Sequence, residues 1–160
     1  MFKLLSKRFI SLLIIGLMAV SLVFTYMVSV REYDYAKGEL IDKSRVMAQQ
    51  ILSTRFFLAN NQDKINKDSK GNFEFKGLNP ARGIFLISEY FNKNRSYQIK
   101  QTSFPDKVRN RHNLPDDWEL KALQTLKESP HLTEFYGEVK NSDGKFFRYA
   151  LPLYIDETCI

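Results

Sequence analysis

The sequence is poor in cysteine, glycine and proline. Its 160 residues include one cysteine, seven glycines and five prolines. The single cysteine, Cys159, excludes a disulfide bond within the chain. Few glycines and prolines, together with 44% hydrophobic and 14% aromatic residues, exclude the disordered and low-complexity classes. The composition is that of a chain with one folded core.

Acidic residues are also missing from the start of the chain. Lys3, Lys7 and Arg8 precede a run without any charge, residues 9–30, FISLLIIGLMAVSLVFTYMVSV. As a helix this run would span about 33 Å, which matches the hydrocarbon thickness of a bilayer. A cleaved signal peptide is the alternative, but its apolar segment has about 7–15 residues and ends in a small-x-small site. The sequence therefore predicts an uncleaved transmembrane helix.

The basic residues before this run predict its orientation. Positively charged flanks stay in the cytoplasm, so residues 1–8 are expected there and the rest of the chain in the periplasm of a bacterial inner membrane. The net charge of +6 falls to about +3 beyond the run, which is ordinary for a solvated surface and argues against nucleic-acid binding. No Ser/His/Asp set or phosphate-binding glycine loop is visible, and the adjacent Asp116 and Asp117 suit a helix start. The sequence therefore predicts a protein that is not an enzyme.

Periodicity predicts that the apolar helix continues from residue 31 to about 61. No proline interrupts this stretch, and it carries one stripe of apolar and small residues. The stripe consists of Tyr33, Ala36, Leu40, Ser44, Met47, Ile51, Thr54 and Leu58. We interpret it as a core-facing helix, and the alternative is a signalling stalk that pairs two copies into a homodimer.

Residues 62–160 are predicted to form an α+β domain with a small antiparallel sheet. One helix is expected from Pro80, capped by Asn79, to about Asn94, and a second from residues 115–117 to Ser129. The buried side of the second helix is expected to hold Trp118, Ala122, Leu123 and Leu126. Strands are expected at 73–75, 96–102, 132–140 and 145–155, the last two joined by the hairpin turn 141–144.

Several blocks of residues 62–160 resemble a family of extracytoplasmic sensor domains with a PAS-like fold that bind c-type haem. The blocks are KGLNPA at 76–81, IKQTS at 99–103, Arg109-Asn110 with Asn113, PDDWE at 115–119 and PLYIDETC at 152–159. Such domains stand at the head of histidine kinases, chemoreceptors and cyclic-dinucleotide enzymes. The resemblance implies a PAS-like fold and a sensory role for residues 62–160.

The resemblance also implies a haem site, from which this chain departs. The family continues from the first cysteine into a Cys-x-x-Cys-His motif, whereas this sequence has only Cys159 followed by Ile160. We expect a chain truncated within that motif, to which haem is not attached in the usual way. Cys159 would be the first thioether, and Lys100 and Arg109 would pair with haem propionates or another anion. Candidates for a distal iron ligand are His112 and His131. The face formed by Phe147, Tyr149, Leu151 and Leu153 would wall the pocket.

The leading hypothesis is a membrane-anchored periplasmic sensory input domain of a signal-transduction protein. One alternative is a membrane-tethered c-type cytochrome that carries electrons. The other is a haemless module that binds a small anion or a protein.

Overall fold

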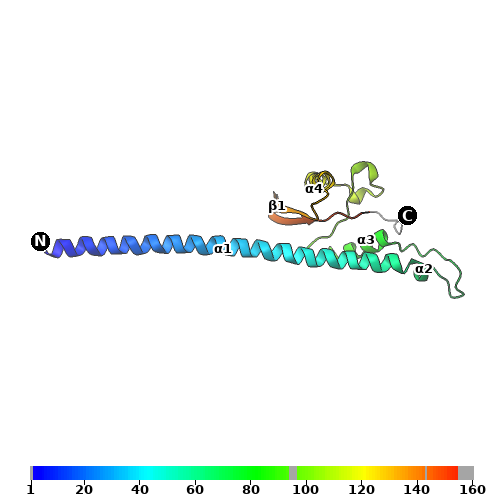
Figure 1. The fold of residues 1–160 in the computed structure, drawn as a ribbon, viewed down its shortest axis with the longest axis horizontal. Coiled ribbons are helices and arrows are strands. Elements are labelled where there is room, and N and C mark those ends of the chain that lie inside the picture. The colour runs from blue at the N-terminus through cyan, green and yellow to red at the C-terminus, as the bar shows by residue number, and fades with distance from the viewer. Residues whose placement is uncertain (1, 94–96, 143, 155–160) are drawn as a thin grey trace. The chain divides into compact units, whose positions relative to one another are not determined.

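The computed structural model describes residues 2–93, 97–142 and 144–154 (Figure 1). The chain divides into two compact units, Met1–Asp42 and Lys43–Ile160. Its elements, in chain order, are α1 (Phe2–Asn60), α2 (Gln62–Ile65), α3 (Pro80–Phe91), α4 (Asp117–Glu128), β1 (Phe135–Asn141) and β2 (Gly144–Ala150). Single 3-10 turns occupy Pro105–Lys107 and Arg111–Asn113. The described part is therefore α+β, as predicted.

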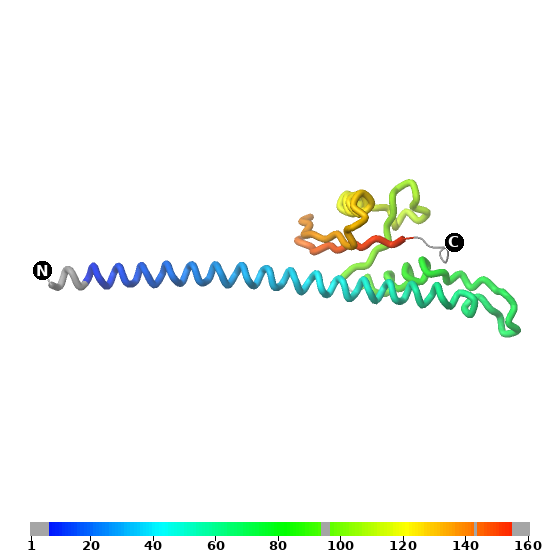
Figure 2. Tube along the Cα trace, in the orientation of Figure 1, coloured from blue at the N-terminus to red at the C-terminus, as the bar shows by residue number. Residues whose placement is uncertain are grey.

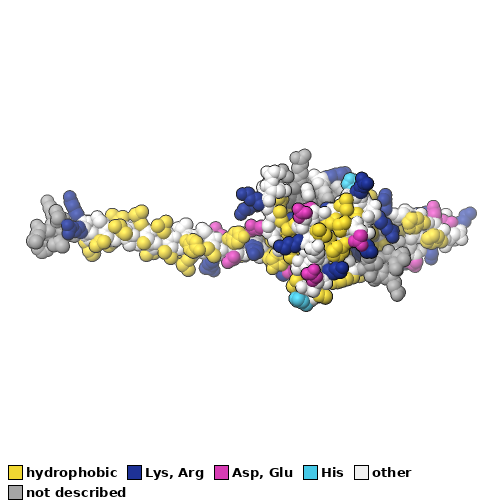
Figure 3. All heavy atoms as spheres, turned by 90° about the horizontal axis from the view of Figure 1, so that it is seen from above, with side chains coloured by type: hydrophobic (Ala, Val, Ile, Leu, Met, Phe, Trp, Pro, Cys, Tyr) yellow, Lys and Arg dark blue, Asp and Glu magenta, His cyan; other side chains and the backbone are white. Residues whose placement is uncertain are grey.

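The first unit is the N-terminal part of α1. Every residue from 7 to 30 is exposed, and Figure 3 shows hydrophobic side chains along this stretch. Exposure of so many apolar side chains to water is unfavourable, whereas a bilayer would accept them. Within the described residues this is the one helix that is long and apolar enough to cross a membrane. In the structure one helix, α1, includes both this run and residues 31–60.

The second unit begins with the last turns of α1. The predicted stripe is half-buried at Ser44, Met47 and Ile51 and buried at Leu58, but Tyr33 is exposed. After α2 the chain turns back, and α3 lies beside the end of α1 (Figure 2). Leu58 comes so close to α3 that a Cβ at Gly83 would overlap its Cδ1 atom. This close approach forms one part of the core, next to the fully buried Ile84.

The predicted start of α3 is confirmed by its cap. Asn79 has extended backbone, and its side-chain oxygen accepts the Arg82 N–H at 2.8 Å. Pro80 at the first helical position loses no hydrogen bond there. The helix ends at Phe91, three residues before the predicted end near Asn94, and the Asn92 side chain then holds a later segment.

The predicted start of α4 and the hairpin are also confirmed. Asp116 caps α4, and the Glu119 side chain accepts the Asp116 N–H in return, which completes a capping box. β1 and β2 pair antiparallel with Tyr136 opposite Tyr149, and Gly144 takes a positive φ of 131° at the turn. The alternation of side chains leaves one face of the hairpin to α4, where Trp118 lies 5.3 Å from the ring of Phe135. Ala122 and Leu126 are buried, as predicted for α4.

Two predicted strands were wrong. At 73–75 the structure has a single bridge between Lys67 and Phe73, and the side chains of Phe73 and Phe75 are exposed. Residues 97–102 pair with no strand in the described part of the chain; instead, the Asn92 side chain bonds both the N–H and the carbonyl of Ile99. The hairpin strands are also shorter than predicted, so the described part of the sheet has only β1 and β2.

Candidate functional site

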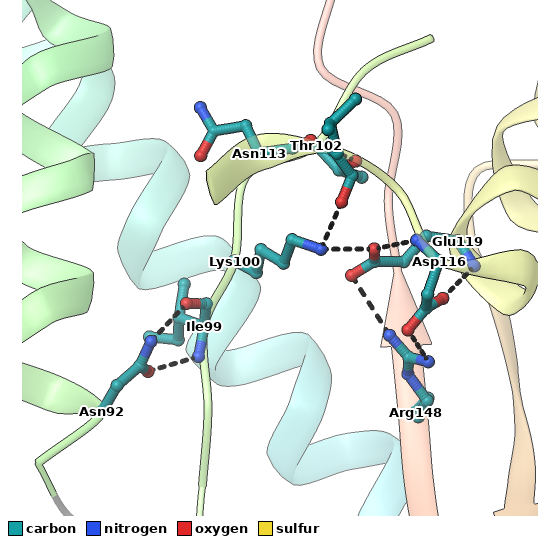
Figure 4. A network of polar contacts seen from close by, with 9 residues as sticks. Asn92, Ile99, Lys100, Thr102, Asn113, Asp116, Glu119 and Arg148 are labelled. Carbon is teal, nitrogen blue, oxygen red and sulfur yellow. Dashed lines mark hydrogen bonds and ion pairs between the residues drawn. The ribbon is translucent and has the colours of Figure 1, made fainter. Parts of the chain in front are cut away.

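Lys100 lies at the centre of a polar network in the second unit (Figure 4). It follows the segment that Asn92 holds, with bonds of 2.7 and 2.8 Å to Ile99. Its Nζ atom donates to the Leu114 carbonyl and to Glu119 Oε2, each at 2.7 Å. The ammonium group therefore joins the 97–102 segment to the first turn of α4.

Glu119 is the buried member of this network. Its side chain is 9% exposed, and Arg148 of β2 donates to its Oε1 atom at 3.1 Å. The second arm of the same guanidinium bonds Asp116 Oδ2 at 2.7 Å. A buried carboxylate is costly unless it is paired, and here two cations share two carboxylates, so the four charges balance.

Arg148 also holds the aromatic contact between α4 and the hairpin. Its guanidinium carbon lies 4.6 Å from the ring centre of Trp118, within cation–π range. Burial opposes ionisation of Asp116, but the Glu119 N–H and Arg148 outweigh it and lower the Asp116 pKa. The network thus fixes the N-terminus of α4 against β2.

The other predicted site residues lie elsewhere or outside the description. Arg109 is exposed between the two 3-10 turns, and among the described residues no carboxylate pairs with it. His112 and His131 are exposed as well. Cys159 lies outside the described residues. In the part of the chain that is described, no three His, Cys, Asp or Glu side chains gather closely enough to hold a metal ion.

The aromatic face of the hairpin, Tyr136, Phe147 and Tyr149, lies opposite the face that α4 covers. Tyr136 stacks on Tyr149 with ring centres 6.5 Å apart and on Phe147 at 6.0 Å. Two members of the predicted pocket wall, Phe147 and Tyr149, therefore share one face. The other two, Leu151 and Leu153, follow β2 in a segment without strand pairing.

Sequence reasoning missed Glu119, Arg148 and Gln101. Glu119 stands three residues after Asp116, the spacing of a capping box, and that signal was available. Arg148 had no local signal because its partners lie 29 and 32 residues away in the chain. The Gln101 amide nitrogen, Nε2, is buried without a hydrogen-bond partner among the described residues. This donor is a polar group that a ligand could satisfy.

Residues 31–160 match the family model for Tll0287-like domains. The chain belongs to this family. Its members are sensor domains that bind c-type haem. The match begins at Arg31, one residue after the apolar run ends, and it includes the whole second unit. Comparison with curated proteins and with solved structures gave no match.

Proposed function

We propose that this Tll0287-like chain is a sensory input domain, anchored by residues 9–30 in a bacterial inner membrane and folded in the periplasm. The observation that supports this most is the family match over residues 31–160, which starts where the apolar run ends. Lys3, Lys7 and Arg8 support a cytoplasmic start. A PAS-like fold, pairing of two copies through 31–61 and the lack of an enzymatic activity remain predictions.

The residues of this chain do not fit a haem with two thioether bonds. Such a haem needs two cysteines and an adjacent histidine as iron ligand. The sequence has Cys159 alone, and both histidines are exposed far from it along the chain. We therefore propose that the 160-residue chain does not attach c-type haem, although its family does.

Membrane insertion and orientation can be tested on the chain as it is. We expect it to stay in the membrane fraction after carbonate washing, because 9–30 is uncharged and exposed. A reporter that is active only in the periplasm should be active when it is fused after Ile160. Release of a shortened soluble product would show a cleaved signal peptide instead.

Descent from a haem-binding domain can be tested by extending the chain with a complete attachment motif. Adding one residue, then Cys-His, after Ile160 completes Cys159-Ile160-x-Cys-His. Coexpressed with a cytochrome maturation system, the extended chain should give a haem-stained band on a denaturing gel, and the 160-residue control should not. If the extended chain folds and is exported without Soret absorbance while a control cytochrome matures, the haem-binding descent is wrong.

A further inference from the structure

A second polar cluster joins α1 to both strands of the hairpin. Arg45 of α1 donates from Nε to Glu134 Oε2 at 2.9 Å and from Nη2 to Oε1 at 2.6 Å. The Tyr149 hydroxyl of β2 donates to the same Oε2 atom at 2.8 Å. Glu134 directly precedes β1. One carboxylate therefore receives bonds from a helix and from β2 while its own backbone leads into β1.

The geometry distinguishes this cluster from an ordinary surface ion pair. Exposed pairs contribute little because their side chains sample many positions. Here the planar guanidinium engages both carboxylate oxygens, and such a fork fixes direction as well as distance. The Arg45 side chain is 52% exposed but that of Glu134 only 20%, and the Tyr149 ring stacks against Tyr136. The donor and acceptor groups are thus held by rigid elements.

The position of Tyr149 connects this cluster to the network at Lys100. Tyr149 and Arg148 are neighbours on β2, so their side chains point to opposite faces of the hairpin. Arg148 bonds Asp116 and Glu119 on one face, and Tyr149 bonds Glu134 on the other. A shift or twist of β2 therefore displaces both sets of bonds together.

We propose that Arg45, Glu134 and Tyr149 form a latch through which a displacement of β2 reaches α1. The latch passes it to Arg45, on the helix that also carries the apolar run. Its use in signalling rests on the sensory role proposed above, but the mechanical link does not.

Hydrogen exchange on the purified full chain in detergent, read by mass spectrometry, tests the link without any ligand. Arg148→Gln disturbs β2 from the α4 side, and Lys100→Met is a milder disturbance of the same network. In the wild-type background we expect each to quicken amide exchange both in β2 and in residues 43–60 of α1. With Tyr149→Phe or Arg45→Lys added, the effect in β2 should persist and the effect in 43–60 should be lost.

Tyr136→Phe is the matched control, because it keeps the aromatic stack and its hydroxyl has no hydrogen-bond partner among the described residues. It should leave transmission to 43–60 unchanged. The latch is refuted if exchange in 43–60 responds to Arg148→Gln equally with and without Tyr149→Phe. It is also refuted if β2 responds while 43–60 does not. Membrane fractionation and haem staining are unaffected by either result, so failure of the latch and failure of the sensory proposal can be told apart.

Discussion

Replacing Lys100 with methionine separates two roles for this residue. The family resemblance implies that Lys100 pairs with an anionic ligand, whereas the structure pairs its ammonium with Glu119 and the Leu114 carbonyl. Methionine keeps most of the apolar stem of lysine and removes only the charge and the donors. If the network holds the fold, Lys100→Met lowers stability without any ligand present.

The size of the stability loss in Lys100→Met depends on which hydrogen-bond partners Glu119 keeps. Removing one partner of a fully buried ion pair costs about 3–5 kcal/mol, and an exposed pair contributes about 0.2–1 kcal/mol. Glu119 is 9% exposed but Lys100 is 37% exposed, so solvent screens part of the attraction. Arg148 still bonds Oε1, and the Asp116 N–H still bonds Oε2. We therefore expect a loss of about 1–2 kcal/mol, or roughly 5 °C in melting temperature.

The assay is thermal or urea unfolding of the detergent-solubilised chain, followed by fluorescence of Trp118. This is the only tryptophan, and it lies under Arg148, so its emission reports on the network. In a double-mutant cycle with Glu119→Gln, the two changes should cost less together than the sum of the single losses.

Arg109→Met is the matched control, because Arg109 was the other cationic candidate and is exposed. Its effect should stay within about 0.5 kcal/mol. If Lys100→Met costs no more than Arg109→Met, or if the cycle is additive, the network does not hold the fold.

Three further outcomes are expected. Gly83→Ala should lower the melting temperature, at a cost of about 1–3 kcal/mol, because the new Cβ would overlap Leu58. Adding Leu58→Ala should remove this clash. The double variant should therefore lose less stability than the sum of the two single losses. Burial and the bond to Glu134 raise the Tyr149 pKa to about 12. The contribution of Tyr149 to stability is therefore complete below pH 10 and is lost as the pH rises from 10 to about 12. Tyr149→Phe should flatten that part of a stability–pH curve, and an unchanged slope would contradict the assignment. Arg45 lowers the Glu134 pKa. The contribution of Glu134 to stability is therefore complete when the pH is above the ordinary pKa of a glutamate, and it is lost as the pH falls through the lowered pKa. In acid unfolding, Glu134→Gln should abolish this loss.

Local signals predicted most of the elements correctly. Asn79 before Pro80 and Asp116 before Asp117 mark helix starts because capping depends only on residues within one turn. The turn at 141–144 depends likewise on a glycine that tolerates positive φ, which is Gly144 here. These features could be predicted because the sequence that encodes them is contiguous.

The errors came from side chains that act over a distance. Residues 97–102 have the alternation of a strand, but Asn92 supplies the bonds that a neighbouring strand would have supplied. Lys100 stays a predicted ligand cation, but its ion pair with Glu119, 19 residues away in the chain, was not predicted. Pairings of this kind are set by tertiary packing, which a single sequence does not specify.

The engagement of Lys100 changes what ligand binding would do to the domain. An anion that recruits Lys100 must compete with the Glu119 carboxylate, and Glu119 would then depend on Arg148 alone among the cations. A change in the bonds of Arg148 would act on β2, the strand that also carries Tyr149. An anion bound through Arg109 would leave this network intact, since Arg109 is exposed outside it. Binding through Lys100 should therefore quicken amide exchange in β2, whereas binding through Arg109 should leave β2 unchanged. Only the first mode leads from the ligand to β2, whose Tyr149 shares the Glu134 carboxylate with Arg45 of α1.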